Sequence, residues 1–161
     1  MSTETKLEIF ADYYQFYLSD EVATFRLENI WHDPQSVLDM IDAGPGEVAV
    51  GTVRNFTVPV TVRIFDSDPE YNPDQWDHIT EASLEIASGR LVVMGCTDYE
   101  PDAKRIAVEP GLYRVRVHYA DLDSVAPNGL DGDDYIEVVL WQDEPVEPRV
   151  LKRSDAAPRG A

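Results

Sequence analysis

The sequence predicts an all-β fold, an antiparallel two-sheet β-sandwich with one short helix at about residues 34–42. Short segments rich in β-branched and aromatic residues recur along the chain, and Gly, Pro, Asn and Asp residues separate them. One segment has a helical pattern, whereas a parallel α/β fold would need several helices. The length of 161 residues is close to that of one domain.

Eight strands are expected, and they cover residues 7–18, 47–53, 58–65, 78–86, 91–96, 105–108, 112–119 and 135–141. Within residues 7–18 the apolar side chains change from odd to even positions, which predicts a bulge or bend near residues 11–12. In residues 112–119 apolar and polar side chains alternate. This pattern is typical of a half-buried antiparallel strand whose polar face, which includes His118, lies at the surface.

The helix is predicted from its boundaries and its apolar stripe. Asp33 suits the N-cap, Pro34 suits the first helical position, and Gly44 is expected to end the helix. The stripe consists of Val37, Leu38 and Ile41.

Residues 1–150 are expected to form one sandwich domain. Residues 151–161 have no apolar period, so we expect a flexible C-terminal tail.

Charge, hydropathy, the start of the chain and the cysteine count argue against several classes of protein. Thirteen Lys and Arg residues against 31 Asp and Glu residues give a net charge of −18, which argues against nucleic-acid binding through phosphate contacts. No apolar run is long enough for membrane insertion. The start of the chain lacks the pattern of a signal peptide, and the single Cys96 cannot form an internal disulfide. We therefore expect a cytoplasmic protein.

The acidic residues concentrate in two loops, residues 66–77 and 121–134. No Lys or Arg occurs between residues 64 and 89, or between residues 117 and 148. One interpretation is that these carboxylates only keep the protein soluble. The other is an acidic face that binds a protein partner with a basic surface. The candidate partner-binding residues are Asp66, Asp68, Trp76, Asp77, Asp131, Asp133 and Asp134.

No motif indicates catalysis or a cofactor. The sequence has no nucleophile elbow, phosphate-binding loop or Cys-x-x-Cys pair, and its three histidines are far apart. We therefore predict no catalytic residues, no resident metal and no cofactor, and the protein is not expected to be an enzyme. Residues 66–77 have acids in part of a calcium-loop spacing, but Tyr71 stands where that loop needs glycine. A calcium- or carbohydrate-binding sandwich that uses both acidic loops is the alternative.

Four features follow one another in the order found in some small bacterial β-sandwich proteins. They are the run Tyr13-Tyr14-Gln15-Phe16, Trp76 in the acidic loop, the strand Pro110-Gly111-Leu112-Tyr113-Arg114-Val115, and the closing run Asp134-Tyr135-Ile136-Glu137-Val138-Val139-Leu140-Trp141. In this order the chain resembles the competence-associated ComJ family, which is described as inhibitors of a membrane nuclease. The resemblance implies a non-catalytic inhibitor or immunity-type protein. An acidic surface could occupy a basic nuclease site as a mimic of nucleic acid.

Overall fold

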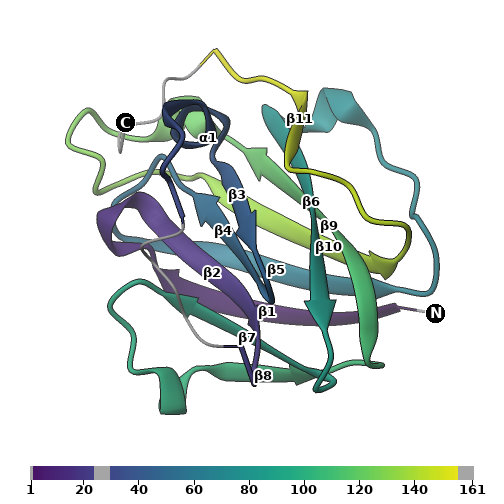
Figure 1. Ribbon diagram of the computed structural model, residues 1–161. Helices are drawn as coiled ribbons and strands as arrows, with labels where there is room; N and C mark the ends of the chain where they lie inside the picture. Colours follow the sequence, from purple (N-terminus) through teal and green to yellow (C-terminus); the bar gives the residue numbers. More distant parts are fainter. Residues whose placement is uncertain (1, 24–29, 156–161) are drawn as a thin grey trace.

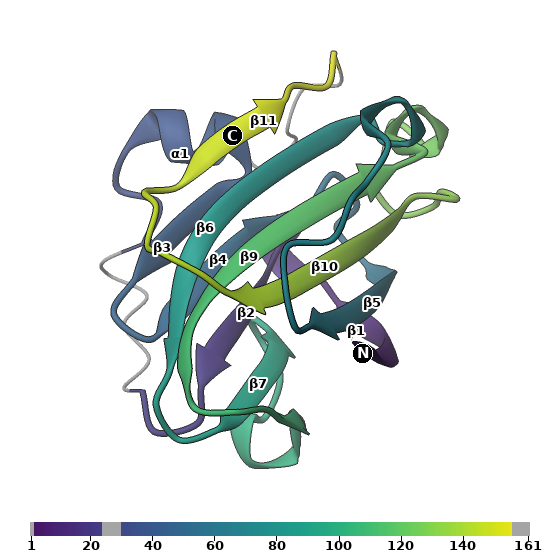
Figure 2. The same ribbon diagram turned by 90° about the vertical axis from the view of Figure 1, so that its right-hand side faces the viewer.

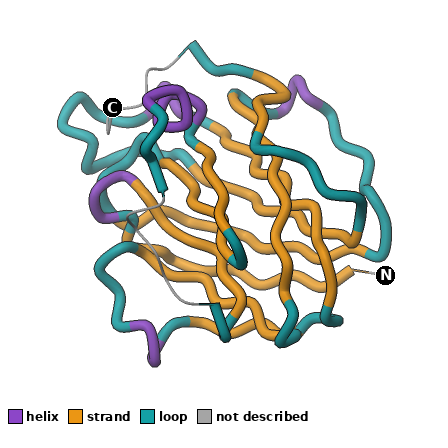
Figure 3. Tube along the Cα trace, in the orientation of Figure 1, coloured by secondary structure: helices purple, strands orange, loops and turns teal. Residues whose placement is uncertain are grey.

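The computed structural model describes residues 2–23 and 30–155, and it confirms the predicted β-sandwich with one short helix. Two sheets face each other (Figures 1 and 3). The first has the order β1 (Ser2–Phe10), β5 (Thr57–Phe65), β10 (Tyr135–Gln142), β9 (Gly111–Ala120), β6 (His78–Ile86) and β11 (Arg149–Lys152). The second has the order β3 (Ile41–Gly44), β4 (Glu47–Gly51), β2 (Gln15–Asp20), β7 (Arg90–Gly95) and β8 (Lys104–Ala107).

The strands pair antiparallel with one exception. β10 runs parallel to β5, with Ile136 beside Val60 and Leu140 beside Ile64. A hairpin cannot join parallel neighbours, and here the chain completes β6 to β9 before it returns as β10. The inward faces of both sheets form one apolar core, in which Phe16, Val60 and Val138 are fully buried.

The pairing defines two ends of the sandwich. Phe10 pairs with Thr57 and Ala120 with Tyr135 at one end, which we call the Tyr135 end. Ser2 pairs with Phe65 at the opposite end, which we call the Gln142 end. Loop 121–134 joins β9 to β10 and therefore lies at the Tyr135 end.

Residues 7–18 do not form one strand, so that part of the prediction was wrong, whereas the chain does bend directly after Ala11 as expected. β1 ends at Phe10 in the six-stranded sheet, and β2 begins at Gln15 in the other sheet. A single 3-10 turn (η1, Asp12–Tyr14) makes the crossing, and Tyr13 and Tyr14 within it have positive φ. Because β1 and β2 lie in different sheets, each strand directs its own apolar side chains into the core between the sheets. This explains why the apolar side chains change from odd to even positions.

The helix α1 (Pro34–Asp39) starts as predicted and ends earlier. The carboxylate of Asp33 accepts a hydrogen bond from the Gln35 N–H, and Pro34 occupies the first turn. Met40 ends the helix in the left-handed conformation, whereas Gly44 was expected to do so. Ile41 and Gly44 instead form β3, which extends the smaller sheet.

The C-terminal segment is more ordered than the predicted tail. Arg149–Lys152 forms β11, which pairs with the edge of β6, with Val150 opposite Thr80. The Ser154 N–H then donates to Nδ1 of His78. Residues 151–155 are thus held against the sandwich, and the rest of the expected tail lies outside the described residues. Within the described part of the chain, no helix is long and apolar enough to cross a bilayer.

Candidate functional site

Loop 66–77 is not a tip of the sandwich but a strap across the outer face of the six-stranded sheet. It leaves β5 after Phe65 at the Gln142 end and reaches β6 at the Tyr135 end, where the Asp77 N–H donates to the Tyr119 carbonyl oxygen. Figure 2 shows this segment passing in front of β10. We call residues 66–77 the strap.

Aromatic and cationic side chains are stacked under the strap. The guanidinium of Arg116 lies 4.1 Å from the ring centre of Tyr71 and 4.6 Å from that of Trp141. Trp76 lies 4.9 Å from the His118 ring and 5.9 Å from the Tyr135 ring. The polar face of β9 is therefore covered, with Arg116 2% and His118 1% exposed. The expectation of a half-buried strand with His118 at the surface was wrong, because the strap replaces solvent there.

His118 is held neutral under the strap. Burial, and secondly the charge of Arg116, lower the pKa of His118 to about 4. Its Nε2 atom accepts a hydrogen bond from the Arg116 Nε–H at 3.3 Å. An imidazole that must accept from a permanently charged guanidinium cannot also carry a proton on that nitrogen. The pair therefore lies within β9, and the contacts of Arg116 with Tyr71 and of His118 with Trp76 join this strand to the strap.

Four of the predicted partner-binding residues belong to the strap. Asp66 lies at the Gln142 end. Asp68 accepts a hydrogen bond from Arg116 Nη1 at 3.0 Å, and Asp77 accepts one from the Leu122 N–H at 2.9 Å. Trp76 is half-buried, and its ring packs against His118. Asp68, Trp76 and Asp77 thus hold the strap in place.

Asp134 is not available to a partner, which corrects its place among the contact residues. It is 2% exposed and forms an ion pair with Arg54, with Nη2 2.6 Å and Nε 2.8 Å from the same carboxylate oxygen. The same guanidinium also donates to the carbonyl oxygens of Thr57 and Asp134. This group joins the start of β5 to the start of β10.

Asp131 and Asp133 are exposed beside a groove at the Tyr135 end. The groove has a volume of about 640 Å³. Its apolar surface includes Phe56, 50% exposed, and Leu130, 43% exposed. We call it the acidic groove, and its lining residues are Glu8, Arg54, Phe56, Thr57, Ser124, Ala126, Leu130, Asp131, Gly132 and Asp133.

Sequence reasoning missed the residues that other elements bring to this groove. Glu8 comes from β1, and Phe56 precedes β5. Phe56 meets Phe10 edge to face, with ring centres 5.8 Å apart. The pairing of β5 with β10 brings Phe56 beside loop 121–134, and the pairing of β1 with β5 adds Glu8. No local pattern in the sequence specifies these pairings.

The acidic residues do not gather as the calcium alternative requires. Among the described residues, no three His, Cys, Asp or Glu side chains are placed to hold one metal ion. The carboxylates of Asp68, Asp77 and Asp134 instead bond to Arg116, Leu122 and Arg54 within the protein.

Trp76→Ala is expected to loosen the strap and to lower the free energy of unfolding by about 1–2 kcal/mol, because a half-buried ring leaves His118. Water then reaches the imidazole, so the pKa of His118 should rise from about 4 toward its ordinary value. An NMR titration of His118 and a urea melt measure both effects. Tyr99→Ala, which removes an aromatic ring that is 71% exposed, is the control and should change neither. An unchanged His118 titration would contradict the role of Trp76.

The fold has known relatives among solved structures. The chain is similar to ComJ from Bacillus subtilis, described as an inhibitor of the DNA-degrading activity of NucA, with a TM-score of 0.67 and 12% identity over 89% of this chain and 99% of ComJ. It is also similar to the protein of crocagin biosynthetic gene J, with a TM-score of 0.56 and 16% identity over 89% of this chain and 98% of that protein. No family model and no curated protein sequence matches the chain. The resemblance predicted from the sequence is therefore confirmed at the level of the fold.

Proposed function

We propose that the protein is a non-catalytic binding module that docks a basic protein partner, of the nuclease class, through the acidic groove. The observation that carries this proposal is the composition of the groove, which exposed Phe56 and Leu130 line together with Asp131, Asp133 and Glu8. Protein interfaces combine apolar anchors with a polar rim in this way.

The charge of the groove is not cancelled by its one cation. Arg54 lines the groove, but its guanidinium is bonded to the buried carboxylate of Asp134. That pair is neutral as a unit, so the exposed carboxylates determine the sign of the potential. A basic surface that enters the groove therefore meets carboxylates that form no ion pair with another described residue, together with apolar contact area.

Exposed acids contribute negative charge around the groove. A net charge of −18 on a surface of 8062 Å² gives one charge per about 450 Å², or about two on an interface of ordinary size. Exposed acids at the Tyr135 end include Glu8, Asp121, Asp123, Asp131 and Asp133, while others, such as Glu85 and Glu109, lie at the Gln142 end. The charges at the Tyr135 end attract a cationic partner and make its association sensitive to salt.

The similarity to ComJ supports a nuclease as the partner class. ComJ is described as an inhibitor of the DNA-degrading activity of NucA, and it shares this fold. A nuclease needs a basic surface to hold phosphates, and the acidic groove offers carboxylates in place of phosphates. Inhibition then requires only occupancy of that surface, without any reaction.

The test compares the immobilised wild-type chain with the variant Asp131→Lys/Asp133→Lys in cell extract at low salt. We expect the wild type to retain a basic protein that a salt gradient elutes and whose DNA-degrading activity falls when free wild-type chain is added. The double variant should bind that protein at least tenfold more weakly, since four units of charge change beside the anchors.

The matched control is Glu85→Lys/Glu109→Lys, which makes the same change of net charge with two exposed acids at the Gln142 end. This variant should retain the partner as the wild type does. Equal loss in both variants would mean that only net charge matters and would reject the groove. Retention by the Asp131→Lys/Asp133→Lys variant, or retention of no basic protein by the wild type, would reject the proposed function.

A further inference from the structure

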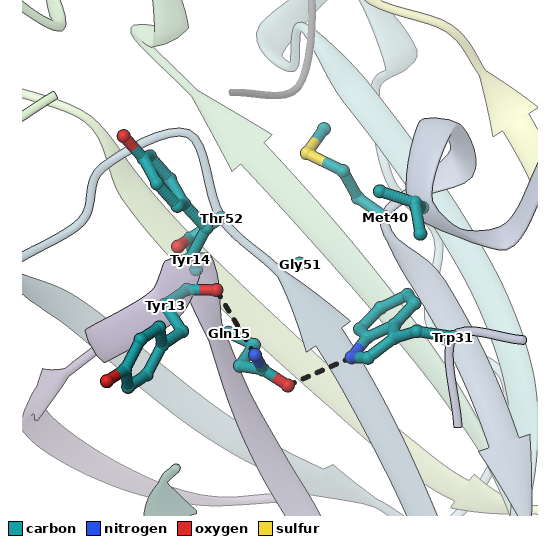
Figure 4. Close-up of a pocket in the computed structure, with 8 residues that line it drawn as sticks. Tyr13, Tyr14, Gln15, Trp31, Met40, Gly51 and Thr52 are labelled. Atoms are coloured by element: carbon teal, nitrogen blue, oxygen red, sulfur yellow. Dashed lines mark hydrogen bonds between the residues drawn. The ribbon is translucent and has the colours of Figure 1, made fainter. Parts of the chain in front are cut away.

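A small cavity lies at the Tyr135 end beside the acidic groove. Its volume is about 120 Å³, and Tyr13, Tyr14 and Trp31 form its aromatic walls (Figure 4). Val37 of α1 and Met40 at the end of that helix complete an apolar lining. Two distant parts of the chain, η1 and the segment from Trp31 to Met40, thus meet around one space.

The backbone around this cavity is held in an unfavourable conformation. Five of the described non-glycine residues have φ between 56° and 65°, and four of them line the cavity: Tyr13, Tyr14, Trp31 and Met40. L-residues rarely adopt this left-handed conformation, and such residues cluster at binding sites, where their surroundings hold them. Here the Thr52 N–H donates to the Tyr14 carbonyl oxygen, and the Trp31 N–H donates to Asp42.

The polar side chains of Trp31, Gln15 and Thr52 in the wall are already bonded within the protein. Trp31 Nε1 donates to the Gln15 side-chain oxygen at 2.9 Å, and Gln15 Nε2 donates to the Tyr13 carbonyl oxygen at 3.1 Å (Figure 4). The Thr52 hydroxyl donates to the Arg54 carbonyl oxygen. An occupant gains little by offering hydrogen bonds to these groups, so the cavity favours an apolar group.

The size of the cavity distinguishes between kinds of occupant. Sites for cofactors and other small molecules enclose roughly 300–1,000 Å³, well above the volume found here. A cavity of about 150 Å³ holds one benzene molecule. The space therefore matches one aliphatic or small aromatic side chain.

Tyr14 joins the cavity to the loop that lines the acidic groove. A Cβ atom placed on Gly129, within loop 121–134, would lie 3.0 Å from the Tyr14 hydroxyl oxygen, so the Tyr14 ring packs directly on this loop. The Gly129 carbonyl oxygen also accepts a hydrogen bond from the Asn55 N–H, next to the groove residue Phe56. The cavity and the acidic groove are therefore neighbours, connected through loop 121–134.

We propose that this cavity is an anchor site that receives one apolar side chain of the same basic partner whose cations meet the acidic groove. The inference rests on the proposed function and adds a specificity element to it: the partner must present an apolar side chain next to a basic segment. The rigid aromatic walls are formed before binding, which lowers the entropy cost of association.

The test uses two defined peptides, acetyl-Lys-Lys-Leu-Lys-Lys-amide and its counterpart with Asn in place of Leu, at low salt. The Trp31 indole N–H signal in an NMR titration reports occupancy of the cavity. We expect the wild type to bind the Leu peptide about tenfold more tightly than the Asn peptide. Val37→Phe should abolish this preference, because the new phenyl ring fills the cavity. The control Leu38→Phe places the same ring at an exposed position outside the cavity, so this variant should keep the preference for the Leu peptide.

A second variant guards against a folding defect in Val37→Phe. Val37→Ala enlarges the cavity and should shift the preference from Leu toward a peptide with Phe at the same position. Asp131→Lys/Asp133→Lys should weaken both original peptides while the ratio between them is kept. Equal binding of the Leu and Asn peptides to the wild type, lost in the charge variant, rejects the anchor site and keeps the proposed function. A Leu preference that is kept while neither salt nor the charge variant weakens the binding of either peptide supports the cavity and rejects the proposed function.

Discussion

Arg54→Met is expected to lower the free energy of unfolding by about 3–5 kcal/mol, because it leaves the buried carboxylate of Asp134 without a partner. The side chain of Arg54 is 12% exposed, so water cannot replace the lost hydrogen bonds to Asp134 and Thr57. For a chain of this length the loss corresponds to a fall in Tm of about 10 °C. Thermal and urea unfolding followed by circular dichroism measure the effect.

Two controls separate the buried pair from ion pairs in general. Arg90→Met removes a pair with Glu21 in which the arginine side chain is 53% exposed, and it should cost at most about 1 kcal/mol. Arg54→Met/Asp134→Leu removes both buried charges, so it should recover most of the stability lost by Arg54→Met alone. A single variant as stable as the wild type would contradict the structural role assigned to Arg54.

The strands with strong alternation could be predicted from the sequence. His78–Ile86 was predicted with the observed bounds because turn residues flank a segment of high β-propensity. β11 was missed because Arg149–Lys152 is short and lies at a sheet edge, where backbone bonds to β6 rather than an apolar pattern hold it. The change of parity in residues 7–18 was seen but misinterpreted, since a bulge and a crossing between sheets leave the same pattern.

The candidate site was predicted at the level of loops and not of individual residues. Asp133 and Asp134 are neighbours in the sequence, yet one is exposed and the other is buried. The difference arises from Arg54, which lies 80 residues away and reaches Asp134 only when β5 and β10 pair. The anchor cavity could not be predicted, because Tyr13, Tyr14, Trp31 and Met40 are residue types that give no signal of a left-handed backbone.

His118 is expected to make stability fall in mild acid. Burial and the neighbouring Arg116 lower its pKa in the folded protein to about 4, whereas the unfolded chain titrates near pH 6.5. As the pH falls from about 6.5 to 4, the unfolded state gains a proton that the folded state does not accept. The contribution of His118 to stability is therefore fully present above pH 6.5. Below pH 6.5 the free energy of unfolding decreases by about 1.4 kcal/mol per pH unit, which amounts to about 3 kcal/mol at pH 4.

His118→Gln tests this effect, because glutamine cannot titrate but can still accept the hydrogen bond from Arg116. Urea unfolding is measured at intervals between pH 7.5 and 4, and the free energy of unfolding is plotted against pH. The slope for the variant should be smaller than that for the wild type by the amount that corresponds to about one proton. Burial also lowers the pKa of His78, but His78 and all carboxylates are present in both proteins. The difference between the curves therefore belongs to His118. Parallel curves would mean that water enters under the strap and that residues 66–77 do not seal the outer face of the sheet.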